Sequence, residues 1–206
     1  MLSKITSVSE ELQASFKELL TKNLLGGGGI ASLLSAKITL INSDVEDNLA
    51  GKNVFQDCRL VATGQPTTGP ENAPFVSLGG GIFNYAGTIN LDNSNIKNNN
   101  ATNGGGIWSG TNVYLTKATI EGNKATNGAG IFNANKSIAN LLNTTVTRNI
   151  AEQNGGGILN EGDLTFISTE ITENQACNGG GIYSTGLLLV FDSEINRNSP
   201  NNVIKK

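Results

Sequence analysis

Apolar residues recur along most of the chain in short alternating stretches of about three to five residues. Alternation of this kind predicts β-strands, and the stretches are too short for amphipathic helices. The beginning of the chain differs, because Leu12, Phe16, Leu19 and Leu20 follow one another at helical spacing. The pattern therefore predicts one helix followed by a long series of short strands.

The strand-forming part is a tandem repeat. An isoleucine preceded by Gly-Gly-Gly or Gly-Ala-Gly recurs every 24 to 27 residues, at Ile82, Ile107, Ile131, Ile158 and Ile182. A second apolar anchor keeps the same interval, at Ile96, Ile120, Val146, Ile171 and Ile195. A unit of this length cannot bury its own apolar face, so we expect successive units to stack as a solenoid.

Asparagine follows each second anchor by three residues, at Asn99, Asn123, Asn149, Asn174 and Asn198. Another series precedes the glycines, at Asn103, Asn127, Asn154 and Asn178. Equivalent residues of stacked coils lie about 4.8 Å apart, so an amide can donate to one neighbour and accept from the other. These columns predict structural asparagine ladders at the turns.

We expect an all-β fold, a right-handed parallel β-helix of about six to seven coils over residues 27–206. A leucine-rich repeat would need a dense leucine lattice that the unit lacks. Ile30, Val45 and Asn48 repeat the unit weakly in an early coil. Residues 54–78 fill one further period, and we interpret them as an irregular coil with a protruding loop at 64–74.

Residues 1–26 form a separate segment. Ser7 and Glu10 have the spacing of a capping box, which predicts an amphipathic helix at about 8–25 that caps the open end of the solenoid. The sequence Leu24-Leu25-Gly26-Gly27 also resembles a double-glycine export leader of the bacteriocin type. That resemblance implies cleavage after Gly27 and export; without it, the lack of a classical signal peptide implies a cytoplasmic protein.

The amino-acid composition excludes several classes of fold and of functional site. The chain of 206 residues holds 29 asparagines and 26 glycines, which excludes a helical bundle. A net charge of −3 argues against nucleic-acid binding, and no apolar run is long enough for a membrane span. Histidine is absent, so we expect neither a metal site nor a cofactor. Cys58 and Cys177 have no metal-ligand spacing, and we expect a buried thiol at Cys58 and an exposed thiol at Cys177.

The paired motifs Gly-Gly-Gly-Ile or Gly-Ala-Gly-Ile and Ile-x-x-Asn resemble the GG[A/G]I and F-x-x-N repeats of chlamydial-type polymorphic outer-membrane proteins, within the pectin-lyase-like β-helix superfamily. The resemblance covers residues 79–201 strongly and 27–53 weakly. This chain has Ile or Val where the family's second motif has Phe, and no autotransporter barrel follows the repeats. The resemblance implies an adhesin-like recognition module of bacterial type.

Two groups of residues are candidate sites. An outward-facing stripe follows the glycine-linked isoleucines and could stack sugar rings or form a cross-rung ladder: Phe83, Trp108, Phe132, Leu159 and Tyr183. Glu170 and Glu194 lie one rung apart, the carboxylate separation of a retaining glycosidase. The neighbouring column of Arg148, Glu173 and Arg197 favours a solvated salt-bridge ladder instead.

The sequence thus favours a non-catalytic recognition, adhesion or structural module, with carbohydrate or another protein as its partner. The alternative is a carbohydrate-active enzyme of lyase, epimerase or glycosidase type on the same scaffold. A third hypothesis is self-association through the C-terminal end, at Val203 or Ile204.

Overall fold

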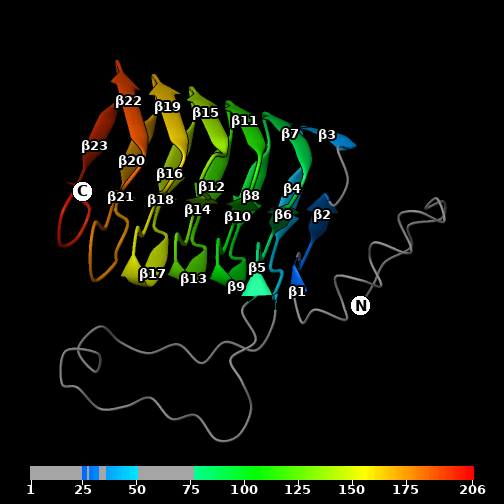
Figure 1. The fold of residues 1–206 in the computed structure, drawn as a ribbon, viewed down its shortest axis with the longest axis horizontal. Helices are drawn as coiled ribbons and strands as arrows, with labels where there is room; N and C mark the ends of the chain where they lie inside the picture. The colour runs from blue at the N-terminus through cyan, green and yellow to red at the C-terminus, as the bar shows by residue number, and fades with distance from the viewer. Residues whose placement is uncertain (1–24, 27, 33–35, 51–76) are drawn as a thin grey trace, which may run out of the picture.

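The computed structural model describes residues 25–26, 28–32, 36–50 and 77–206. These residues form an all-β parallel solenoid of about five turns, and this part of the chain contains no helix (Figure 1). Every strand pair is parallel, as a chain wound repeatedly in one direction requires. The all-β solenoid expected from the repeat is confirmed.

Four sheets run along the solenoid, and successive coils contribute strands to them in turn, although sheet A has no strand after β17. Sheet A comprises β1 (Leu25–Gly26), β5 (Ser77–Leu78), β9 (Asn100–Asn103), β13 (Lys124–Asn127) and β17 (Ile150–Asn154). Sheet B comprises β2 (Ile30–Ser32), β6 (Ile82–Asn84), β10 (Ile107–Ser109), β14 (Ile131–Asn133), β18 (Ile158–Asn160), β21 (Ile182–Ser184) and β24 (Val203–Lys205).

The two remaining sheets contain six strands each. Sheet C comprises β3 (Ala36–Ile41), β7 (Gly87–Asp92), β11 (Asn112–Thr116), β15 (Ile138–Leu142), β19 (Asp163–Ile167) and β22 (Leu187–Phe191). Sheet D comprises β4 (Asp44–Glu46), β8 (Asn95–Lys97), β12 (Thr119–Glu121), β16 (Thr145–Thr147), β20 (Glu170–Thr172) and β23 (Glu194–Asn196).

The strand register follows the sequence repeat. In sheet B, Ile107 pairs with Ile82 on one side and with Ile131 on the other. In sheet D, Ile120 lies between Ile96 and Val146. All six of these side chains are 0 % exposed, so the two anchor columns belong to the core. Burying each of them stabilises the fold by about 1.5–3 kcal/mol.

The glycines before each isoleucine allow successive coils to approach closely. A Cβ placed on Gly106 would lie 2.6 Å from the carbonyl oxygen of Gly130 in the next coil. Backbone hydrogen bonds join the same segments, with the amide of Ile107 donating to Gly130 O at 3.0 Å. A side chain at this position would therefore displace hydrogen-bonded backbone.

The expected asparagine ladder is present. Asn99, Asn123, Asn149 and Asn174 are 0 % exposed and are joined through their side-chain amides. The Nδ2 of Asn123 also donates to the carbonyl oxygen of Ile96 at 2.9 Å, so the ladder satisfies backbone groups at the turn. At the C-terminal end, Asn198 donates through Nδ2 to Asn202 Oδ1.

The side chains of the second asparagine column are more exposed to solvent than those of the first. Asn127 donates to Asn103 at 3.2 Å and Asn154 donates to Asn127 at 3.1 Å, with all three side chains only partly buried. This column therefore protects fewer backbone groups from water than the first.

The start of the solenoid differs from the sequence expectation. Strand β2 pairs directly with β6, β3 with β7 and β4 with β8, so no rung separates these coils. The irregular coil and loop expected at 54–78 lie outside the described residues, except for β5. The helix expected at 8–25 also lies outside them apart from Leu25, which belongs to a strand, so a helix reaching Leu25 is wrong.

Candidate functional site

A column of charged residues occupies one corner of the solenoid, directly after the strands of sheet D. Arg148, Glu173 and Arg197 have φ angles of 55°, 57° and 52°, in the left-handed region that non-glycine residues seldom adopt. Each such conformation costs about 1 kcal/mol or more and persists because the stacked coils impose it. The turn projects these side chains into solvent, with Arg148 and Arg197 side chains 63 % and 64 % exposed.

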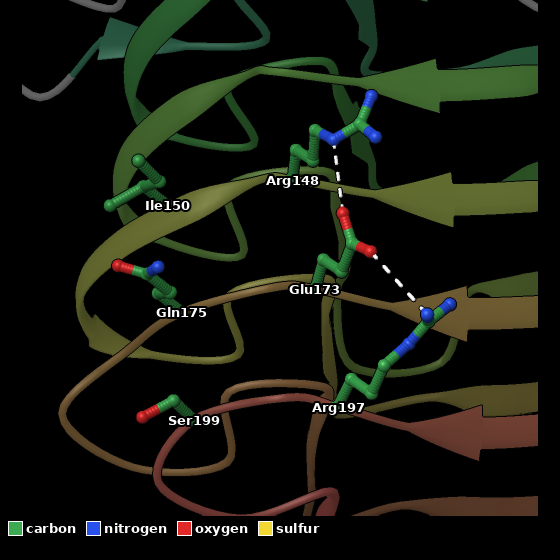
Figure 2. Close-up of a pocket in the computed structure, with 6 residues that line it drawn as sticks. All are labelled: Arg148, Ile150, Glu173, Gln175, Arg197 and Ser199. Atoms are coloured by element: carbon green, nitrogen blue, oxygen red, sulfur yellow. Dashed lines mark hydrogen bonds and ion pairs between the residues drawn. The ribbon is translucent and has the colours of Figure 1, made fainter.

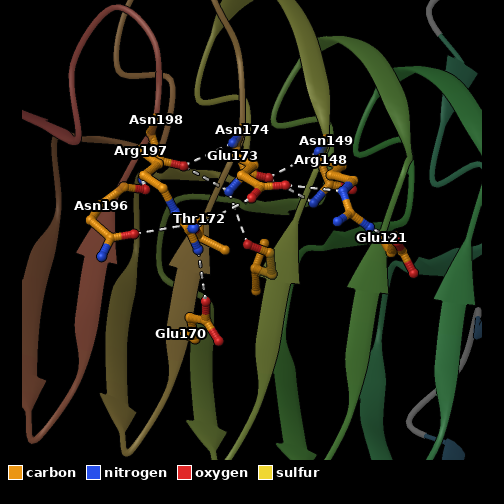
Figure 3. A network of polar contacts seen from close by, with 11 residues as sticks. Glu121, Arg148, Asn149, Glu170, Thr172, Glu173, Asn174, Asn196, Arg197 and Asn198 are labelled. Carbon is orange, nitrogen blue, oxygen red and sulfur yellow. Dashed lines mark hydrogen bonds and ion pairs between the residues drawn. The ribbon is translucent and has the colours of Figure 1, made fainter.

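Ion pairs connect this column across the rungs (Figures 2 and 3). Arg148 Nε donates to Glu173 Oε2 at 3.0 Å, and Arg148 Nη1 donates to Glu121 Oε1 at 2.8 Å. Arg197 lies farther from its partners, 3.8 Å from both Glu173 and Glu170. The hydrogen bond to Glu121, followed by the one to Glu173, raises the pKa of Arg148 above its ordinary value.

A shallow groove of about 380 Å³ lies beside the column. Its other wall is the outward face at the start of β17 and the coils after it, where Ile150 bridges to Gln175 and Gln175 bridges to Ser199. Figure 2 shows the two rows of side chains facing the same opening, which is lined by Arg148, Ile150, Glu173, Gln175, Arg197 and Ser199. Cationic, anionic, amide, hydroxyl and apolar groups thus converge on one surface.

Glu170 and Glu194 are register partners on β20 and β23, one rung apart as expected. Glu170 Oε1 contacts the guanidinium of Arg197, and Glu194 Oε1 accepts a hydrogen bond from Asn196 Nδ2. Neither carboxylate lines the groove. Glu170 thus takes part in the ion pairs of the charged column, whereas Glu194 is held by a neutral amide.

The stripe beside the glycine-linked isoleucines is a stacked ladder. The rings of Phe83 and Trp108 lie 5.2 Å apart, and those of Trp108 and Phe132 lie 6.4 Å apart. Phe83, Phe132 and Leu159 are 1 %, 9 % and 5 % exposed, so the expectation that they face solvent is wrong. Trp108 and Tyr183 keep partial exposure, and Lys206 Nζ lies 5.6 Å from the centre of the Tyr183 ring.

Cys177 does not carry the exposed thiol that we expected. The residue is disulfide-bonded and half-buried. The only other cysteine of the sequence, Cys58, lies outside the described residues.

Among the residues that the structure describes, no group of three or more His, Cys, Asp or Glu side chains could hold a metal ion. Within the same residues, no helix has the length and apolar character needed to cross a membrane.

The groove wall opposite the arginines was missed by the sequence reasoning. Ile150, Gln175 and Ser199 each follow a second anchor by four residues, one position beyond the asparagine ladder. The position is chemically variable and showed no repeat signal. Its importance follows from its place beside the charged column.

The family model of the Chlamydia polymorphic membrane protein repeat matches residues 168–185. The matched segment contains the Ile171-to-Asn174 motif and the glycines that precede Ile182. No curated protein and no solved structure matches the chain.

Proposed function

We propose that the chain is a non-catalytic, adhesin-like β-helical module that recognises an acidic carbohydrate in the groove between Arg148 and Ser199. The observation that carries this proposal is the pair of exposed guanidinium groups, Arg148 and Arg197, two rungs apart on one wall. The β-solenoid and the matched polymorphic membrane protein repeat are consistent with an adhesin-like role.

Arg197 is the stronger anchor for an anion. Its contacts with Glu173 and Glu170, at 3.8 Å, are longer than hydrogen bonds, and its Nε donates to Thr172 Oγ1 at 3.2 Å. A carboxylate of a ligand can therefore take two parallel hydrogen bonds from the remaining guanidinium nitrogens. Arg148 is already bound by Glu121 and Glu173, which offset its charge, so its contribution is the smaller of the two.

The opposite wall supplies the other contacts that a sugar needs. Ile150 is 37 % exposed and offers an apolar surface for the face of a sugar ring. Gln175 and Ser199 follow it along the same wall and can bond hydroxyl groups. On the aromatic stripe, only Trp108 and Tyr183 have partly exposed rings on which a sugar could stack. The groove is therefore the better-supported binding surface.

The test is binding of the purified protein to an array of acidic and neutral glycans. We expect binding to acidic glycans that falls at least about tenfold in the double variant Arg148→Gln and Arg197→Gln, because charge-assisted hydrogen bonds are lost. Lys37→Gln removes an exposed positive charge elsewhere and should leave binding intact. Binding that is equal for neutral glycans, or unchanged in the double variant, would contradict the proposal.

The alternative of a carbohydrate-active enzyme has less support. Glu170 and Glu194 stand outside the groove, and each already has a polar partner. A catalytic pair would have to act on a substrate held over the flat outer face of sheet D.

We propose right-handed winding, because connections between parallel strands of one sheet are nearly always right-handed. We further propose six to seven coils with an N-terminal helix that ends before Leu25 and caps the stack. Export fits the disulfide at Cys177, since disulfides persist in oxidising compartments.

A further inference from the structure

The outer face of sheet C is unusually apolar. Large hydrophobic side chains that are at least 37 % exposed gather on it: Ile41, Tyr114, Ile138, Leu142, Ile167, Leu187, Leu189 and Phe191. The outer face of sheet D presents Lys97, Glu121 and Glu170 instead. A concentration of exposed apolar groups on one face marks an interaction surface.

The register of sheet C arranges this face in rows. One row runs across the rungs through Leu142, Ile167 and Phe191. From β11 to β22 the central row contains Tyr114, Asn140, Thr165 and Leu189, and beyond β11 it continues through Asn90 and Thr39. Within the four strands from β11 to β22, polar residues lie between two larger apolar ones, and this order is symmetric about a line between β15 and β19.

Charged residues at the rim have the same symmetry. Lys117 follows β11 directly and Asp192 follows β22 directly, at equivalent corners three rungs apart. At about 4.8 Å per rung they are too distant to pair within one chain. Both are exposed, and neither has an ion pair among the described residues.

We propose that this face binds a second copy of the chain, about a two-fold axis that runs parallel to the strands between β15 and β19. The rotation exchanges β11 with β22 and β15 with β19. Lys117 then faces the partner's Asp192, and Asp192 faces the partner's Lys117. Leu142 faces the partner's Ile167, and Tyr114 faces the partner's Leu189. The same operation therefore matches opposite charges at the rim and apolar residues inside it.

A second copy is the occupant that this arrangement favours. In an isologous interface a surface must be complementary to itself, and the rim charges and the rows of Leu142 and Tyr114 meet that condition. In the row at the start of the strands, Ile138 faces the partner's Asp163. The central polar residues also match, because Asn140 faces the partner's Thr165. The proposal is independent of the groove, which lies beyond sheet D, and it differs from association through the C-terminal end at Val203 or Ile204.

The first experiment measures molar mass by light scattering at roughly 100 µM protein. We expect twice the chain mass of 21.5 kDa for the unmodified protein. The double variant Leu142→Lys and Ile167→Lys should be monomeric, because it places four positive charges in the interface. Leu49→Lys changes a residue that is 60 % exposed on another face and should leave the dimer intact.

The second experiment exchanges the rim charges. Lys117→Asp or Asp192→Lys alone should weaken dimerisation about tenfold, because each creates two like-charge contacts, and the combined variant should restore it. Circular dichroism checks that each variant is folded. A monomeric unmodified protein, a dimer that survives the double lysine variant, absence of charge-exchange rescue, or a dimer that dissociates on Val203→Lys would each overturn the proposal.

Discussion

The side-chain amide of Asn123 donates from Nδ2 to Oδ1 of Asn149, one rung away, at 3.0 Å. The Oδ1 of Asn123 in turn accepts hydrogen bonds from the backbone and side-chain nitrogens of Asn99. Both the oxygen and the nitrogen of the Asn123 side-chain amide are therefore hydrogen-bonded, and the residue is not exposed to water. The same residue that carries the repeat signal in the sequence satisfies the buried turn in the structure.

Removing this amide should destabilise the solenoid strongly. Asn123→Ala leaves the carbonyl of Ile96 and the amide of Asn99 unsatisfied in a buried turn, so we expect a loss of about 2–5 kcal/mol. Asn127→Ala, in the partly buried second column, should cost about 1 kcal/mol or less. Chemical denaturation followed by circular dichroism measures both. Equal losses in the two variants would show that burial of the first column has no special role.

The corner glycines offer a second matched pair. Gly106→Ala brings a Cβ within 2.6 Å of the Gly130 carbonyl oxygen and should destabilise by about 1–3 kcal/mol. Gly122→Asn should change stability by about 0.5 kcal/mol or less. Gly122 has a φ of 66°, a region that Asn98 already adopts in the same column, and its nearest neighbour is the flexible end of the Asn98 side chain. Thermal midpoints provide the comparison, and a Gly106→Ala protein as stable as the parent would contradict the close-approach argument.

The two carboxylates of β20 and β23, Glu170 and Glu194, should have no catalytic role. We expect Glu170→Gln and Glu194→Gln, singly and together, to leave glycan binding unchanged. Neither variant should remove any polysaccharide hydrolysis or elimination that the parent protein shows. The measurement is product release from a panel of polysaccharides. An activity present in the parent and lost in both variants would restore the enzyme hypothesis.

Cys177 should resist alkylation until the protein is reduced. After denaturation without reductant, the peptide that carries Cys177 is expected to remain unmodified by iodoacetamide, and reduction should make it reactive. Peptide mass spectrometry separates the two states. Alkylation of protein from an oxidising compartment before reduction would show that the disulfide does not form.

The repeat predicts much of the architecture because identical side chains must stack. The interval between Ile82 and Ile107 gives the register of sheet B directly, and Asn99 and Asn123 give the ladder. The contacts at the charged column also follow from spacing, since Arg148 and Glu173 occupy equivalent positions one coil apart.

Other features depend on information that a periodic pattern does not carry. Simple alternation places Phe83 outside the core, but neighbouring rings and side chains bury it. The groove and the apolar face depend on positions that vary from coil to coil, such as Ile150 and Leu142. Their role depends on which side chains occupy the neighbouring rungs. The direct contact of β2 with β6 likewise could not be inferred from chain length alone.

The stacking register is the central claim, because the ladder, the groove and the dimer face all derive from it. Nuclear Overhauser spectra of protein labelled at isoleucine methyl groups test it most directly. We predict cross-peaks from Ile107 to Ile82 and Ile131, and from Ile158 to Ile131 and Ile182, since neighbouring rungs are about 4.8 Å apart. A strong cross-peak between Ile82 and Ile158, or absence of the sequential series, would contradict the solenoid register.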